Sequence, residues 1–241
     1  MAYAHAARGI RRRAHNPLLA PIVVFVGAIA VAVAYVGYVL WPRWPEVPVA
    51  LDAPALPIVV AGTTFTIEPA AIRMRVQRRP GMQERLDLAY VWPTLAPPVS
   101  SPKPSPTPAP VERLFVTIQA ADGTLPPAER VSTIYPRYLV AEPVAGPAGL
   151  TMRVFRDDSP YRGEELVFDA ETPAHFLARC SKKGAIGPGN CLLDRRIGDA
   201  DITIRFSRDW LNDWRRVRDA IDALMQRLHP NSELSSPGLS R

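Results

Sequence analysis

The 241-residue chain carries 29 basic and 23 acidic side chains, and its net charge of +6 is unevenly placed. Residues 1–16 hold four arginines and no acid, so the rest of the chain, with 25 basic and 23 acidic groups, contributes only +2. A nucleic-acid-binding protein concentrates Lys and Arg on its working surface. The distribution therefore argues against nucleic acid as a partner.

An apolar segment near the N-terminus has the length of a membrane span. Residues 18–40 contain no charged side chain, and a helix of this length reaches ~35 Å, enough to cross a hydrocarbon core of ~30 Å. We predict a transmembrane helix over residues 17–40, with the lipid bilayer as its partner. Its apolar surface includes Leu18, Val24, Val31, Val36 and Leu40.

A basic head precedes this segment and predicts its orientation. Basic residues beside a membrane helix stay in the cytoplasm, so residues 1–16 are expected there and residues 41–241 across the membrane. The 27 prolines and the predominance of Arg over Lys are typical of a GC-rich bacterial genome, which makes the far side a periplasm. The orienting residues are Arg8, Arg11, Arg12 and Arg13.

A cleaved signal peptide is the alternative to a retained anchor, because Ala28-Ile29-Ala30 and Ala32-Val33-Ala34 resemble small-residue cleavage sites. However, the apolar stretch continues past both to Leu40, with no polar region before either site. Aromatic residues then follow where the far interface would lie, as amphipathic rings prefer. The sequence therefore favours a single-pass protein of the inner membrane.

Small residues form a narrow stripe along the predicted span, at Gly27, Ala30, Ala34 and Gly37. Their three- and four-residue steps place them on one face of a helix, and such faces allow two helices to approach closely in lipid. Small residues are also common in any alanine-rich span. The stripe is consistent with a homodimer through the membrane helix but does not require one.

Short apolar runs dominate residues 58–229 and predict a periplasmic α+β domain, mostly of antiparallel sheets arranged as a sandwich or roll. A proline-rich spacer at 41–57 precedes it. A Pro/Ser/Thr-rich loop at 96–111 interrupts it, which we interpret as an insertion within one domain, the alternative being a linker between two. The predicted strands are 58–61, 65–68, 72–77, 86–92, 114–119, 138–142, 152–155, 165–168, 192–195 and 202–206.

One long helix is predicted at the C-terminal end, from Arg208 to Leu228, before a disordered tail at 230–241. Its apolar residues recur at three- and four-residue steps, so we expect it to pack on a sheet. An alternative is that two of its aromatic residues, Trp210 and Trp214, form an exposed surface for a partner. The residues expected to contact the sheet are Trp214, Val217, Ile221 and Leu224.

Cys180 and Cys191 are the only cysteines, and both fall on the predicted oxidising side of the membrane. The ten residues between them are rich in Gly, Pro and Ser, which let a chain turn back, so we predict a disulfide bond. A redox pair is less consistent, because exchange sites usually have Cys-x-x-Cys spacing. A zinc site with His175 and His229 would match no familiar ligand spacing.

Motifs for catalysis are not evident in the sequence. There is no Gly-x-Ser-x-Gly elbow, and the glycine-rich residues 184–189 lack the Gly-Lys-Ser/Thr ending of a phosphate loop. Carboxylate pairs at 157–158 and 164–165 flank one turn, and glycosidases use two carboxylates, but adjacent acids in such a turn are usually solvated. No cofactor or metal is predicted.

These observations predict a non-enzymatic binding or scaffold protein of the bacterial cell envelope, with other envelope proteins as partners. The alternative is a membrane-tethered periplasmic hydrolase or small-ligand-binding protein whose site is not visible in the sequence. A deep polar pocket containing His175 or the carboxylates of residues 157–165 would favour the alternative. A flat exposed apolar patch would favour the binding protein.

Overall fold

The computed structural model describes residues 19–40, 49–98, 112–123, 125–182, 184 and 189–230. Contacts divide the chain into two units, Met1–Val47 and Pro48–Arg241. Several predicted features lie outside the described residues: Arg8, Arg11, Arg12, Arg13, Leu18, most of the spacer, the loop from residue 99 to 111 and the tail from residue 231.

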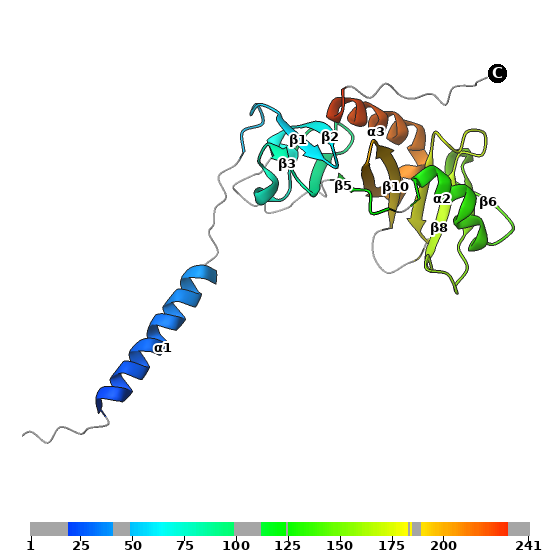
Figure 1. Cartoon of the computed structure of the whole chain (residues 1–241). Coiled ribbons are helices and arrows are strands. Elements are labelled where there is room, and N and C mark those ends of the chain that lie inside the picture. The colour runs from blue at the N-terminus through cyan, green and yellow to red at the C-terminus, as the bar shows by residue number, and fades with distance from the viewer. Residues whose placement is uncertain are drawn as a thin grey trace, which may run out of the picture. The chain divides into compact units, whose positions relative to one another are not determined.

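The first unit contains helix α1, Leu19–Leu40, drawn in blue in Figure 1. Residues 21–40 are all exposed, and the span Pro21–Leu40 has a mean hydropathy of 2.5. A helix that is apolar all round needs cover from protein or lipid. By length and composition α1 can cross a membrane, and the structure thus agrees with the predicted apolar helix. A signal sequence can have the same length and apolar composition.

The second unit is built on two sheets. The larger sheet has eight strands, all paired antiparallel, and the smaller has three, with β3 parallel to β1. In spatial order the larger sheet is β4 (Arg85–Val91), β5 (Arg113–Ala120), β11 (Ala200–Ser207), β10 (Asn190–Ile197), β9 (Leu177–Ser181), β8 (Glu164–Phe168), β7 (Thr151–Val154) and β6 (Val144–Ala145); the smaller is β2 (Thr63–Ile67), β1 (Leu56–Val60) and β3 (Gly81–Met82).

The helices of this unit are short except for α3, Trp214–Leu228. Helix α2 covers Pro127–Thr133, and five 3₁₀ turns complete the described elements: η1 (Pro69–Ala71), η2 (Arg75–Gln77), η3 (Tyr135–Arg137), η4 (Pro147–Gly149) and η5 (Arg208–Asp213). One large antiparallel sheet and a C-terminal helix confirm the predicted α+β class.

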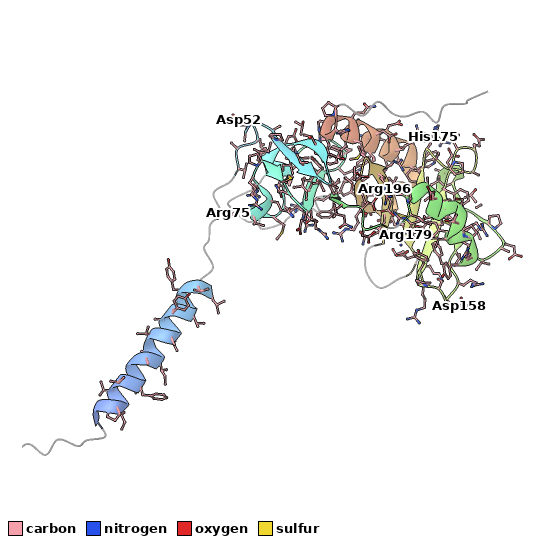
Figure 2. All side chains as sticks on the ribbon, in the orientation of Figure 1. Asp52, Arg75, Asp158, His175, Arg179 and Arg196 are labelled. Carbon is pink, nitrogen blue, oxygen red and sulfur yellow. A yellow bond between two sulfur atoms is a disulfide. The ribbon has the colours of Figure 1, made fainter. Side chains whose placement is uncertain are left out.

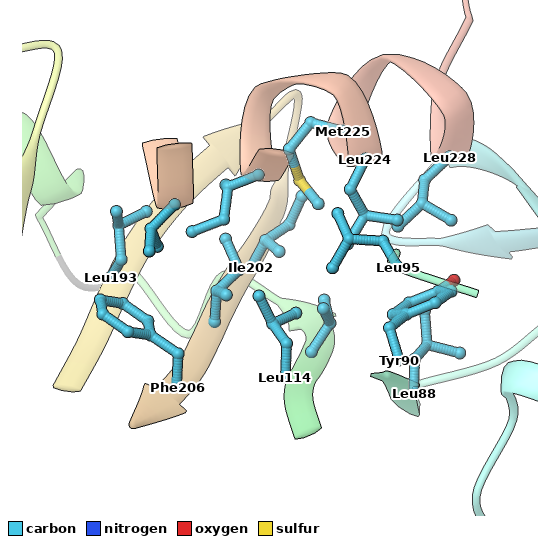
Figure 3. Close-up of a cluster of buried hydrophobic side chains, with 14 of the residues drawn as sticks. Leu88, Tyr90, Leu95, Leu114, Leu193, Ile202, Phe206, Leu224, Met225 and Leu228 are labelled. Carbon is cyan, nitrogen blue, oxygen red and sulfur yellow. The ribbon is translucent and has the colours of Figure 1, made fainter. Parts of the chain in front are cut away.

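Helix α3 packs on one face of the larger sheet, and the main hydrophobic core lies between them (Figure 3). Residues of β1 and β2 join the same core, including Phe65 and Ile67. The helix buries the side chains that recur at three- and four-residue steps in its sequence. Facing this apolar stripe toward the sheet removes the largest apolar area from water. These are Trp214, Val217, Ile221, Leu224, Met225 and Leu228.

A second apolar cluster brings α2 and η3 together with β7, β8 and β9. Tyr135 packs edge-on against Phe155 with ring centroids 5.5 Å apart, and Leu166 lies beneath them. Leu166 alternates along β8 with Glu165 and Val167, and Val167 belongs to the main core. The α2 side is therefore the opposite face of the sheet.

Three local predictions differ from the structure, and some of its elements were not predicted. Residues 72–77 form an isolated bridge at Ile72 and a 3₁₀ turn, because Gln77 turns its side chain onto β4. Residues 138–142 contain only an isolated bridge at Leu139. The predicted C-terminal helix starts as η5, where Ser207 accepts a hydrogen bond from the Asp209 amide. Strand β9 and helix α2 were not predicted.

The proline-rich loop joins two neighbouring strands, since Val91 of β4 pairs with Arg113 of β5. The start of the predicted loop belongs to the fold. Leu95 is buried in the main core, and the Val91 amide donates to the Ala96 carbonyl at 2.9 Å. The part that can be exposed linker is therefore shorter than 96–111.

Candidate functional site: a cleft beneath helix α2

A cleft of about 490 Å³ opens between α2, the turn at 173–174 and strands β9 and β10. This volume lies within the range of roughly 300–1,000 Å³ that is typical of ligand sites. Its walls are mainly apolar and its inner end is charged. The lining residues are Pro126, Pro127, Ala128, Val131, Tyr135, Pro173, Ala174, Leu177, Arg179, Leu192, Asp194, Arg195 and Arg196.

The local sequence explains why α2 forms one wall. Pro127 occupies the start of the helix, where a missing N–H costs nothing and the fixed φ suits helical geometry. Val131, one turn later, packs on the second apolar cluster together with Tyr135. Burial raises the pKa of Tyr135, opposed by the neighbouring Arg179 and Arg130, so its hydroxyl stays protonated and can donate a hydrogen bond.

A polar hollow of about 190 Å³ adjoins the cleft and shares Arg179, Asp194 and Arg195 with it. The Arg130 guanidinium lies 3.5 Å from Asp194, which also accepts a hydrogen bond of 2.9 Å from Thr203. These contacts bring α2, β10 and β11 to one point. They hold Asp194 as a fixed, partly buried acceptor.

Arg179 lies at the centre of the charged end. It donates to Glu164 at 2.7 Å, and its guanidinium carbon sits 5.4 Å from the centre of the Tyr161 ring. Burial acts to lower the pKa of Arg179, but the acidic groups of Tyr135, Glu164 and Asp194 outweigh burial and raise it. The guanidinium is therefore charged at any physiological pH.

Two donors at this end have no acceptor. The Nε–H groups of Arg130 and Arg179 are buried and make no hydrogen bond within the described part of the chain. Buried polar groups in native proteins are nearly always paired, and leaving one unpaired costs about 1–3 kcal/mol. At the charged end of the cleft, two buried guanidinium Nε–H groups therefore lack partners, although Asp194 and Glu164 accept from other atoms of the same two arginines or lie beside them.

The hypothesis that Trp210 and Trp214 form an exposed partner surface is wrong. Their side chains are 6% and 2% exposed. Trp210 stacks on Trp92 with centroids 4.6 Å apart, and the Trp214 indole donates to the Ala148 carbonyl at 3.2 Å. Both complete the apolar stripe that covers the sheet, which explains their spacing.

Cys180 and Cys191 form a disulfide, as predicted. The two residues face each other across β9 and β10, and the bond rules out a zinc site that uses their thiolates. Within the residues described here, no group of three or more His, Cys, Asp and Glu side chains could hold a metal ion.

The structure does not assemble a site from His175 and the carboxylates of residues 157–165. Figure 2 shows His175 and Asp158 at opposite ends of this region. The carboxylates are engaged in ion pairs: Asp157 with Lys182, Asp158 with Arg156, Glu164 with Arg179, and Glu165 with Arg208. This agrees with the interpretation that they are ordinary turn and strand acids.

Sequence reasoning missed the residues that form the cleft. Arg179 alternates with the buried Ala178 and Cys180, and Asp194 follows the buried Leu193. This period of two could have indicated strands with one charged face. Nothing in the sequence indicated that α2 would lie across that face, because the helix has only seven residues and begins at the second of two consecutive prolines.

No known protein family matches the sequence, and no curated protein does either. Two solved structures are similar in fold. One is Smlt3025, an immunity protein of the Stenotrophomonas maltophilia type IV secretion system, with 13% identity, a TM-score of 0.48 and coverage of 76% of this chain and 98% of that one. The other is the Neisseria meningitidis iron-regulated outer membrane lipoprotein FrpD, with 10% identity, a TM-score of 0.41 and coverage of 74% and 96%. Similarity at this level does not assign a function.

Proposed function

We propose that the chain is a single-pass protein of the bacterial inner membrane whose periplasmic domain is a non-enzymatic binding module. The cleft beneath α2 is the binding site, and its ligand is a segment of another envelope protein. The cleft carries this proposal, because it joins apolar walls to a charged end at which the buried Nε–H groups of Arg130 and Arg179 have no hydrogen-bond partner among the described residues.

The anchoring part rests on α1 and the residues before it. The helix is uncharged, exposed and long enough to span a bilayer, and four arginines precede it in the sequence. The disulfide between Cys180 and Cys191 supports an oxidising compartment for the domain, because such bonds are rare in the cytosol.

The chemistry of the cleft indicates what it would bind. Val131, Leu177 and Leu192 offer apolar surface for a ligand side chain. A carbonyl or carboxylate of the ligand at the charged end could pair with the guanidinium group of Arg179, and one that reaches the adjoining hollow could pair with that of Arg130. An extended protein segment supplies both features, since apolar side chains alternate with backbone carbonyls along it.

Topology can be tested with reporter fusions at the C-terminus. A reporter that is active only in the periplasm should be active, and one that is active only in the cytoplasm should be silent. Extraction at high pH should leave the uncleaved chain in the membrane. A mature N-terminus near Tyr35 would contradict the anchor.

Binding in the cleft can be tested by cross-linking in living cells, with a photoreactive residue at Ala128 or at Glu129. Ala128 lines the cleft, whereas its neighbour Glu129 is exposed and does not. A protein adduct is expected from position 128 alone, and Val131→Arg should abolish it. Equal adducts from both positions, or none at 128, would contradict the proposed site; a small-molecule adduct would favour the ligand-binding alternative.

A further inference from the structure

A second surface combines positive charge with exposed apolar side chains, far from Arg179 in Figure 2, where Arg75 marks it. It is formed by residues 73–82, here called the Arg/Met segment. Met74, Val76 and Met82 are 51%, 70% and 86% exposed. The arginines of the segment are Arg73, Arg75, Arg78 and Arg79.

The Arg/Met segment is held in place by its own hydrogen bonds. The Gln83 side chain donates to the carbonyls of Gln77 at 2.9 Å and Arg79 at 2.7 Å. Arg78 donates to the Ile72 carbonyl at 3.1 Å, and Met82 pairs with Val59 of β1. The exposed side chains therefore project from a formed backbone, so little ordering entropy would be lost on binding.

Within the Arg/Met segment the charge is of one sign, although the exposed Glu84 follows it closely in the sequence. Residues 73–83 contain no acid, and Arg75 and Arg79 are exposed without an ion pair among the residues that the structure describes. The positive surface extends onto the larger sheet, where Arg73 and Arg205 lie 4.8 and 4.7 Å from the centre of the Phe115 ring.

We propose that the Arg/Met segment docks on the anionic phospholipid surface of the membrane that holds α1. Exposed apolar side chains enter the boundary between headgroups and acyl chains, while adjacent basic side chains bind lipid phosphates. Here Met74, Val76 and Met82 would enter this boundary, and Arg75 and Arg79 would bind the lipid phosphates.

The length of the chain favours lipid as the occupant. Eight residues separate Leu40 from Val49, and they can span at most about 32 Å. If α1 is a membrane span, as proposed above, the tether keeps Val49 within about 32 Å of the end of α1, and the resulting high effective concentration of lipid favours even a weak contact.

The test uses the full chain in vesicles, with an environment-sensitive dye on Met82→Cys or, as a second probe, Val76→Cys. Dye emission should shift to the blue in vesicles that contain phosphatidylglycerol, compared with phosphatidylcholine alone. Each Arg near an anionic surface is worth about a fivefold change in partition, so Arg75→Gln with Arg79→Gln should lower the docking equilibrium constant about 25-fold. Raising salt to 1 M should weaken docking in the same direction.

The matched control is Arg137→Gln with Arg162→Gln, which removes the same charge from two exposed arginines near the opposite end of the sheet. It should leave the dye response unchanged. An identical response in both lipids, an equal loss in the control, or a response that requires an added envelope protein would overturn the inference. Chains that wash off vesicles of either composition would instead refute the anchor.

Discussion

The two faces of the eight-stranded sheet differ sharply, although the same strands form both. In β5, Leu114, Val116 and Ile118 face α3 and are buried. Phe115 and Thr117 alternate with them on the other face and remain partly exposed. The covered face is a continuous apolar layer. The other face combines ion pairs and hydrogen bonds with a smaller apolar cluster, and α2 covers it only in part.

The covered face should therefore determine the stability of the domain, whereas the partly open face carries the proposed binding site. The covered face buries large side chains with little tolerance for change, since interiors are close-packed. The partly open face holds its charges through local pairs such as Arg196 with Asp201, 2.6 Å apart, which contribute less to stability. Substitutions on the two faces should therefore have effects of different size.

The largest effect is expected on the covered face. Trp214→Ala and Ile221→Ala each remove a fully buried side chain and should each cost ~2–5 kcal/mol. Against a typical total of ~5–15 kcal/mol, the double variant should contain little folded protein by denaturant titration. Gln226→Ala, on the exposed side of α3, should change stability by less than ~0.5 kcal/mol. A folded double variant that loses a binding partner would make the stripe an interface.

Loss of the disulfide should rank second. It lies on the covered face, directly behind Arg179 and Leu192, which pair across β9 and β10 on the cleft side. Cys180→Ala with Cys191→Ala should cost ~3 kcal/mol, because the bond closes a short loop in the unfolded chain. The change should lower the unfolding midpoint and also weaken cross-linking from Ala128. Free thiols in the wild-type protein would contradict the premise.

A smaller effect is expected on the open face. Thr117 donates to Asp87 at 3.1 Å, and Thr117→Val should cost about 1 kcal/mol. Thr66→Val, at an exposed position of β2, is the control and should be nearly neutral. An equal cost at both positions would show that the hydrogen bond to Asp87 contributes nothing.

The same carboxylate predicts a dependence on pH. Burial acts to raise the pKa of Asp87, but hydrogen bonds from Arg85, Gln77 and Thr117 outweigh burial and lower it. Its contribution to stability should be complete above about pH 4, the ordinary range of an Asp, and should disappear as pH falls through the lowered pKa. The stability difference between wild type and Asp87→Asn should shrink in that window; a constant difference would argue against ionisation.

The smallest effect is expected from the proline-rich loop between β4 and β5. Replacing residues 99–110 with a shorter Gly/Ser loop should shift the melting temperature by only a few degrees, since loop entropy changes by ~0.6 kcal/mol per doubling of length. Leu95 and Ala96 must stay, because they belong to the fold. Loss of expression would show that the prolines pack against the domain.

The sequence predicted the covered face better than the partly open one. Buried and partly exposed side chains alternate along β5 and β11, and buried side chains recur at helical spacing along α3. These patterns are visible in the sequence, so the elements were predicted. At residues 73–76 Arg alternates with Met and Val, but all four side chains are exposed. The alternation there does not reflect a buried face, and the predicted strand was wrong. The cleft depends on register: Arg179 meets Glu164 only because β8 and β9 pair with Leu166 opposite Arg179, and no local pattern sets that alignment.

The borders of the larger sheet limit how two copies of this domain can associate. Strand β6 at one border has only two residues. At the other, the Gln77 amide accepts from the Asp87 N–H at 3.0 Å and donates to the Arg85 carbonyl at 3.2 Å, while the Arg73 N–H donates to the Asp87 carbonyl at 2.9 Å. An open border would invite pairing between molecules. With these groups occupied, two copies can collide often without pairing their sheets edge to edge.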